Sequence, residues 1–239
     1  MVTPADDAVF RPVRTGNPFE ETVERLLQAI KLGVVRPGDR LPAERDLATR
    51  LNVSRVTLRE AIHALTEAGY VESRRGRYGG TFVNEQLPKP RRTPAKRIAR
   101  ELGEGLDDAL VLRIALETGA AEVAANRTLT AAEEGHLRQC LADSKAAKLT
   151  DYRRFDSRLH LAIAEVTGSA SLTSATADVR MRLNELLDAI PLLERNLEHS
   201  NEQHQAIVDA ILAGDAPAAR AAMREHLSGT AVLLRGFLA

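Results

Sequence analysis

The chain has 239 residues, of which 44% are hydrophobic and 28% charged, with one cysteine and no tryptophan. This composition is that of a globular protein with a substantial core, and the length predicts two domains. The net charge is zero, but residues 1–100 hold 19 basic against 12 acidic residues, so only the first part is suited to bind a polyanion.

What the sequence lacks excludes several classes of protein. The start of the chain has no apolar segment of the kind found in signal peptides, and no run of 18 apolar residues is present to span a membrane. Cys140 has no second cysteine to pair with, which fits a reducing cytoplasm, and we expect it to be a small filler residue in a helix. A cytoplasmic protein without a membrane partner is therefore expected.

The first part of the chain alternates helical patterns with turns. Residues 1–17 show no hydrophobic periodicity and are predicted to be a disordered arm. Apolar residues at helical spacing over 19–30 predict a first helix, and a turn follows at 36–39. A second helix is expected to open at Leu41 and to end at Asn52, because asparagine tolerates the left-handed conformation.

The segment after this helix is the most informative of the chain. Ser54 suits a helix N-cap, because its hydroxyl can accept a hydrogen bond from a first-turn amide, and Gly69 suits a left-handed C-terminal cap. Four apolar residues at helical spacing form the predicted core face: Leu58, Ala61, Ile62 and Leu65. The exposed end carries Arg55, Thr57 and Arg59, which are types of residue that bind base edges in a DNA major groove.

A glycine-rich hairpin completes the first domain. Residues 70–73 and 81–83 are predicted strands, joined by a turn that contains three arginines and three glycines. Such a hairpin next to a helix-turn-helix is a wing, whose arginines can reach phosphates or the minor groove. Residues 18–84 are therefore predicted to be a winged helix-turn-helix DNA-binding domain, and the proline-rich, basic residues 85–97 a linker.

The remainder, residues 98–239, contains only helical patterns. They cover the following ranges: 98–102, 106–126, 131–146, 152–166, 171–189, 192–213 and 216–238. We expect an antiparallel bundle of six or seven helices, which makes the fold mainly α.

Four ordered motifs resemble one family of bacterial regulators. They are Leu41-Pro-Ala-Glu-Arg-Asp-Leu-Ala, Val53-Ser-Arg-Val-Thr-Leu-Arg-Glu-Ala, Leu65-x-x-x-Gly69-Tyr-Val and Gly79-Gly-Thr-Phe-Val. Over residues 19–84 they resemble the DNA-binding signature of the GntR superfamily, and the helical remainder resembles the FadR subgroup with its FCD effector-binding domain. The resemblance implies a homodimeric transcriptional regulator of a short palindromic operator, most often a repressor.

The resemblance also implies a set of DNA contacts. They are Arg45, Ser54, Arg55, Thr57, Arg59 and Gly79. Arg55 and Arg59 lie one turn apart and can fork onto guanine, whereas Arg45, on the preceding helix, is better placed for a phosphate. The alternative is that these arginines are solvated or form ion pairs within their helices.

Three histidines and an aspartate of the second half are candidate metal ligands. Asp156 and His160 are four apart and share a helix face, while His204 and His226 lie on two later helices. Such a set suits a divalent transition metal with positions open for a ligand, although each histidine could instead be an ordinary hydrogen-bonded residue. The set resembles the metal-binding pattern of FCD domains, which implies Zn, Ni, Mn or Fe.

The other histidines fall outside this pattern. We expect His136 and His199 to be solvated, and His63 belongs to the DNA-binding helix. Arg113 and Glu117 match a recurring pair of the family. Arg113 could clamp the carboxylate of an effector in the cavity, or the pair could lie on the surface.

Three functions compete at this point. The first is a DNA-binding repressor, released by a small organic acid that binds at the metal. The second is a metal-dependent enzyme with a winged-helix adaptor, but no His-Glu-x-x-His motif, nucleophile elbow or separate base is present. The third is an architectural protein whose bundle only dimerises, which would need no metal cluster. We therefore expect a regulator rather than an enzyme.

Overall fold

The structure is a computed structural model that describes residues 9–10, 18–76, 79–88, 105–188 and 194–238. The chain divides into two compact units, Met1–Pro90 and Arg91–Ala239. The predicted arm, residues 1–17, lies outside the described residues except for Val9 and Phe10, whose side chains are buried.

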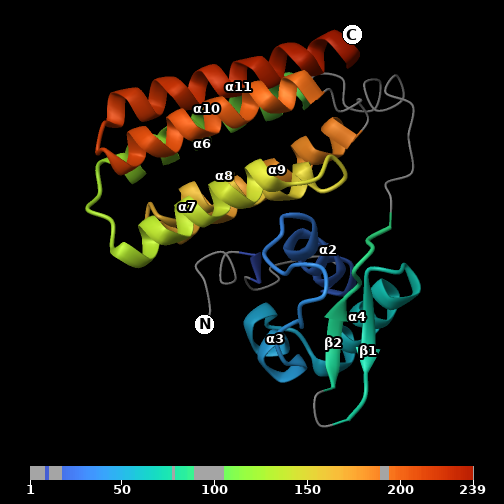
Figure 1. The fold of residues 1–239 in the computed structure, drawn as a ribbon. Helices are drawn as coiled ribbons and strands as arrows, with labels where there is room; N and C mark the ends of the chain where they lie inside the picture. The colour runs from blue at the N-terminus through green and yellow to red at the C-terminus, as the bar shows by residue number, and fades with distance from the viewer. Residues whose placement is uncertain (1–8, 11–17, 77–78, 89–104, 189–193, 239) are drawn as a thin grey trace. The chain divides into compact units, whose positions relative to one another are not determined.

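In its described part the first unit contains three helices and a hairpin. They are α2 (Pro18–Lys31), α3 (Glu44–Leu51), α4 (Arg55–Glu67), β1 (Val71–Arg74) and β2 (Gly80–Val83) (Figure 1). The turn between α3 and α4 contains Asn52 in the left-handed conformation, with a φ of 53°. Ser54 caps α4, because its hydroxyl accepts a 3.0 Å hydrogen bond from the Thr57 amide, and Gly69 follows the helix with a φ of 79°. The helix-turn-helix and its capping residues are therefore confirmed.

The second helix begins later than the sequence predicted. A start at Leu41 is wrong, because the Leu41 amide donates a 2.8 Å hydrogen bond to the carbonyl of Thr81 in the hairpin. The chain stays extended up to Ala43, whose ψ is 140°. An antiparallel bridge between Arg40 and Phe82 strengthens this link. The segment before α3 therefore fastens the helix-turn-helix to the wing.

The wing is a two-stranded antiparallel hairpin. Val71 lies opposite Val83, and Arg74 lies opposite Gly80, so the strand bounds differ from the predicted ones by one residue. The valine pair at the base is buried, while the rest of β1 is exposed. One end of the wing is thus anchored in the core of the unit, and the other end extends into solvent.

The second unit consists, in its described part, of six helices. They are α6 (Gly105–Ala125), α7 (Ala131–Ala146), α8 (Tyr152–Glu165), α9 (Ala170–Asp188), α10 (Glu194–Leu212) and α11 (Ala216–Leu238). These helices match the last six predicted ones within two residues at each end, so the expected helical bundle is confirmed. The additional helix expected over 98–102 and most of the linker, 85–97, lie outside the described residues.

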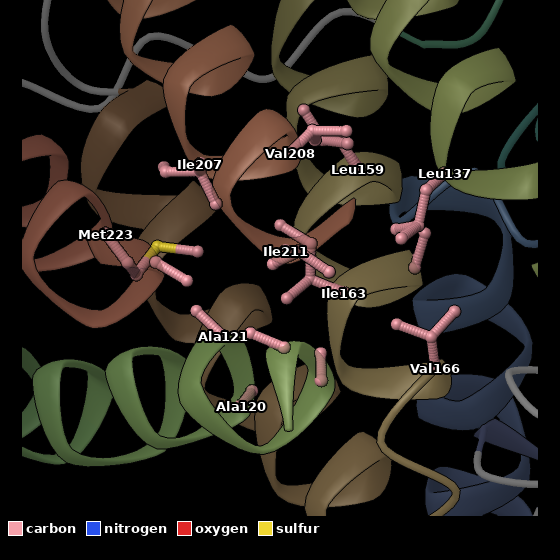
Figure 2. Packing of buried hydrophobic residues seen from close by; sticks show 14 of the residues in the cluster. Ala120, Ala121, Leu137, Leu159, Ile163, Val166, Ile207, Val208, Ile211 and Met223 are labelled. Carbon is pink, nitrogen blue, oxygen red and sulfur yellow. The ribbon is translucent and has the colours of Figure 1, made fainter. Parts of the chain in front are cut away.

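Helix α8 is buried along most of its length. It contacts α6, α7 and α9, while α11 packs on α6 and α10 (Figure 1). Every residue of α8 from Asp156 to Glu165 is buried. Leu159 and Ile163, one turn apart, meet Val208 and Ile211 of α10 in the apolar core (Figure 2). Each such side chain stabilises the fold by roughly 1.5–3 kcal/mol through burial, so this core holds α8 rigidly in place.

Candidate DNA-binding surface and metal centre

The N-terminal end of α4 presents the predicted DNA contacts. Arg55 is exposed, and Thr57 is half-buried with its hydroxyl 2.8 Å from the Ser54 hydroxyl. The main role of Ser54 is to cap the N-terminus of α4, which fixes where this helix begins. On α3, the side chain of Arg45 is 86% exposed and lies 3.5 Å from Asp46. Arg45 and Arg55 are thus both exposed on the surface of the helix-turn-helix.

Arg59 is held by a residue of the other helix, which the sequence analysis did not anticipate. Its Nε donates a 2.8 Å hydrogen bond to Oε2 of Glu44 on α3. The ion pair expected as an alternative was one within a helix, whereas this one joins α3 to α4. Helix periodicity relates only residues of one helix, so the sequence contained no signal for this pair.

Gly79 lies at the tip of the wing, where the backbone closes on itself. A Cβ atom at this position would come within 2.5 Å of the carbonyl oxygen of Arg74. Any other residue would therefore force the turn open. Arg74 also stacks over the Phe82 ring at 4.4 Å and pairs with Glu72 at 2.6 Å. The remaining tip residues, 77–78, lie outside the described part of the chain.

The four predicted metal ligands come together from three helices. Asp156 and His160 are on α8, His204 is on α10 and His226 is on α11. One ligand atom of each lies within 4.8 Å of the others, and all four residues are buried. The three Nε2 atoms are 3.2–3.3 Å apart, and the Asp156 carboxylate is 3.3 Å from Nε2 of His204. Residues up to 70 positions apart in the sequence thus converge on one point.

This geometry fits a metal ion. With metal–nitrogen distances of ~2.0–2.1 Å, tetrahedral ligands are about 3.3–3.4 Å apart, which is close to the observed Nε2 separations. Without a cation, the three Nε2 atoms would face one another at this short distance, and only a few hydrogen bonds could form between the imidazole rings. The donor set, three nitrogens and one carboxylate, suits Zn, Ni, Mn or Fe.

Two of the three outer imidazole nitrogens have an oxygen atom close to them. Nδ1 of His160 lies 2.6 Å from Oε2 of Glu117, and Nδ1 of His226 lies 3.1 Å from Oε1 of Gln203. Nδ1 of His204 has no hydrogen-bond partner among the described residues. A carboxylate or amide oxygen on Nδ1 keeps the proton there and leaves the Nε2 lone pair for a metal.

Two arginines surround the cluster. Arg180 of α9 donates hydrogen bonds to the Asp156 carboxylate and to the Ser157 hydroxyl, and it is fully buried. Arg113 of α6 donates from Nε to Oε1 of Glu117 at 3.2 Å, and their side chains are only 2% and 1% exposed. The expected pair therefore exists, but the surface alternative for it is wrong. Nη1 of Arg113 has no hydrogen-bond partner among the described residues.

Burial and charge together set the protonation of the cluster. Burial lowers the pKa of His160 to about 4 despite the nearby Glu117, and it also lowers the pKa of His226. Burial alone would raise the pKa of Asp156, but Arg180 and the imidazoles hold it well below its usual range. At neutral pH His160 and His226 are therefore neutral and Asp156 is ionised, which are the forms that bind metals.

Neither the contact of Glu117 with His160 nor the place of Arg180 beside the cluster was predicted from the sequence. A signal for the burial of Arg180 existed. Arg180 falls on the apolar stripe of its helix, three residues from both the buried Ala177 and the buried Leu183. Charged residues are almost never fully buried unless they are paired, so a charge at such a position predicts a buried network.

The remaining histidines differ from one another. His199 is exposed, as expected, and His63 of α4 is exposed as well. The expectation that His136 is solvated is wrong in part, because its Nε2 lies 2.9 Å from the buried Glu165 carboxylate and 3.8 Å from the Cys140 sulfur. Cys140 itself is buried in the apolar core of α7, which agrees with its predicted role as a filler.

Comparison with known proteins identifies the family. The L-lactate dehydrogenase operon regulatory protein of Escherichia coli (strain K12) is 32% identical over 239 residues, which cover 91% of this chain and 86% of the relative. The model "Bacterial regulatory proteins, gntR family" matches residues 18–83, and the model "FCD domain" matches residues 108–229. The chain belongs to the GntR family. This GntR-family chain is thus a transcriptional regulator with an FCD effector-binding domain, and the enzyme alternative fits the findings less well.

Further relatives agree with this assignment. The Exu regulon transcriptional regulator of Escherichia coli (strain K12) is 29% identical over 233 residues, covering 90% of this chain and 84% of the relative. The solved structure of E. coli McbR/YncC aligns with a TM-score of 0.53 at 20% identity, over 93% of this chain and 99% of that one, and so shares its fold. In the part of this regulator that the structure describes, no helix is long and apolar enough to cross a membrane.

Proposed function

We propose that this regulator is a cytoplasmic, homodimeric repressor that a small organic acid releases from a short palindromic operator. The observation that carries the proposal is the buried convergence of Asp156, His160, His204 and His226 beside two buried arginines. Two winged domains of a dimer would bind two half-sites, and an effector at the metal would change their spacing.

The metal would be held by the three Nε2 atoms and the Asp156 carboxylate. When bound, it supplies a Lewis-acidic position at which an oxygen ligand can coordinate. Glu117 and Gln203 would hold two of the imidazoles in the required tautomer. The geometry suits Zn, Ni, Mn or Fe alike.

Charge balance supports an anionic effector. The buried side chains of Arg113 and Arg180 are offset by those of Glu117 and Asp156, and His160 and His226 are neutral. A divalent ion would add two positive charges to a buried site, where uncompensated charge is costly. A carboxylate offsets part of this charge, and Nη1 of Arg113, which has no hydrogen-bond partner among the described residues, could donate to it.

The buried position of the cluster also limits the effector to a small molecule. One relative is named for an L-lactate dehydrogenase operon, which associates that protein with a small hydroxy acid. A carboxylate of this size, with a second oxygen for the metal, is the class of effector that we propose.

On the DNA side, Arg55 and Arg59 would fork onto guanine, and Arg45 would contact a phosphate. Thr57 and Ser54 would support these contacts from the start of α4, and Gly79 would let the wing approach the DNA backbone closely.

Arg59→Ala should weaken binding to the operator by about 10-fold or more and hardly change binding to random duplex. Arg45→Ala should weaken both equally and reduce the salt dependence. Equal losses for both duplexes with Arg59→Ala would contradict base recognition by this arginine.

The effector side is tested with a duplex selected by the wild-type protein from a randomised library. We expect operator release on adding a metal together with small organic acids, followed by fluorescence anisotropy. His226→Ala should lower bound metal, measured by elemental analysis, and blunt release, whereas the exposed His199→Ala should behave as wild type. Unchanged metal content in His226→Ala would rule out the cluster as the metal site.

A further inference from the structure

Glu44 links the two helices of the helix-turn-helix through Arg59. Glu44 is the first residue of α3, and Arg59 lies in the second turn of α4. The side chains are 37% and 62% exposed, and the hydrogen bond between Nε and Oε2 is 2.8 Å long. Exposed ion pairs contribute little to stability, so stability alone does not account for this contact.

The atom that Glu44 contacts determines what remains free on Arg59. A guanidinium has five N–H donors in one plane, one on Nε and four on the two Nη atoms. A carboxylate on Nε leaves the edge formed by the two Nη atoms open, and that edge can fork onto O6 and N7 of guanine. A side chain held in its binding orientation also loses less conformational entropy on binding.

We infer that Glu44 is a positioning residue for DNA recognition, which holds Arg59 so that its Nη edge is presented to a guanine. The inference rests on the proposed base contact of Arg59. Glu44, although acidic, would thus favour binding on a surface that contacts DNA. Its charge alone would act in the opposite direction, because a carboxylate near phosphates repels DNA.

These two effects of Glu44 have opposite signs, and two variants separate them. Glu44→Gln removes the charge but keeps an oxygen that can accept the hydrogen bond from Nε at the same reach. Glu44→Asp keeps the charge at the start of α3 but is one methylene too short for the 2.8 Å contact. Glu60→Ala is the matched control, because Glu60 is an exposed acidic residue next to Arg59 on α4.

The experiment measures dissociation constants of the full-length protein for two duplexes by fluorescence anisotropy. One duplex is selected by the wild-type protein from a randomised library, and the other is a scrambled duplex of the same composition. Selectivity is the ratio of the two constants, and thermal melting followed by circular dichroism confirms that each variant folds. Arg59→Ala is measured alone and combined with Glu44→Ala.

We expect Glu44→Ala and Glu44→Asp to lower selectivity about tenfold, and Glu44→Gln to stay within about threefold of wild type. Glu60→Ala should strengthen binding to both duplexes equally. The double variant should lose no more selectivity than Arg59→Ala, because both changes remove one coupled interaction. The inference would be overturned if Glu44→Asp kept wild-type selectivity, or if Glu44→Gln lost selectivity and Glu44→Asp did not. Either result would leave the proposed base contact of Arg59 intact. Wild-type selectivity in Arg59→Ala would overturn the base contact and the inference together.

Discussion

Nδ1 of His160 lies 2.6 Å from Oε2 of Glu117, and both side chains are buried. The two residues come from α8 and α6, and the contact joins the candidate metal centre to Arg113, which pairs with the other oxygen of the same carboxylate. One carboxylate thus orients an imidazole on one side and a guanidinium on the other. A metal and an effector bound there would be coupled through Glu117.

Replacing this carboxylate should weaken metal binding. Glu117→Gln removes the negative charge that raises the basicity of His160, and the loss of such a partner lowers metal affinity about 10- to 100-fold. The affinity is measured by competition with a chromophoric chelator. Glu122→Gln is the control, because Glu122 is on the same helix but pairs with Arg220 at the surface. Equal affinities of the two variants would exclude a role of Glu117 in holding the metal.

Arg180 should stabilise the metal-free protein through Asp156. Arg180→Met leaves a buried carboxylate without its cationic partner, which costs about 3–5 kcal/mol of unfolding free energy. Urea unfolding in the presence of a chelator measures this loss. Added metal should restore part of it, because the ion supplies positive charge beside Asp156 and binds only the folded state.

Arg182→Met on the same helix is the control for this experiment. Arg182 is 47% exposed and pairs with Asp108 at 3.7 Å, so its loss should change the unfolding free energy little. A similar small change in Arg180→Met would show that Asp156 does not depend on the buried guanidinium.

His136 should make the free energy of unfolding fall as the pH rises into the alkaline range. The Cys140 thiol and the Glu165 carboxylate raise the pKa of His136 to about 9, despite its partial burial and the Arg158 guanidinium 2.9 Å from its Nε2. A pKa that is higher in the folded than in the unfolded state means that the protonated form favours folding. This stabilisation is complete below about pH 6.5, the pKa of an unfolded histidine, and is lost as the pH rises through about 9.

The measurement for His136 is the unfolding free energy at pH 6 and pH 10. His136→Gln should be less stable than wild type at pH 6, and the difference should shrink at pH 10. His199→Gln, a change at an exposed histidine, should show no such trend. A constant difference between wild type and His136→Gln across this range would contradict the protonated pair with Glu165.

The sequence by itself determined the elements and much of the chemistry of this protein. Ser54, Asn52 and Gly69 set the ends of helices through local backbone preferences, which need no tertiary contact. The apolar periodicity of the second half located its helices within two residues. The spacing of Asp156 and His160 on one helix, with the family resemblance, indicated a metal centre before any geometry was known.

Only the tertiary structure decided which charged residues meet. Glu44 reaches Arg59, Glu117 reaches His160 and Arg180 reaches Asp156, each across two different helices. Helical periodicity states which residues share a face, but the packing of side chains between helices decides which faces and which turns come together. The start of α3 followed the same rule, because a hydrogen bond from the Leu41 amide to the distant wing outweighed the helical pattern of the local sequence.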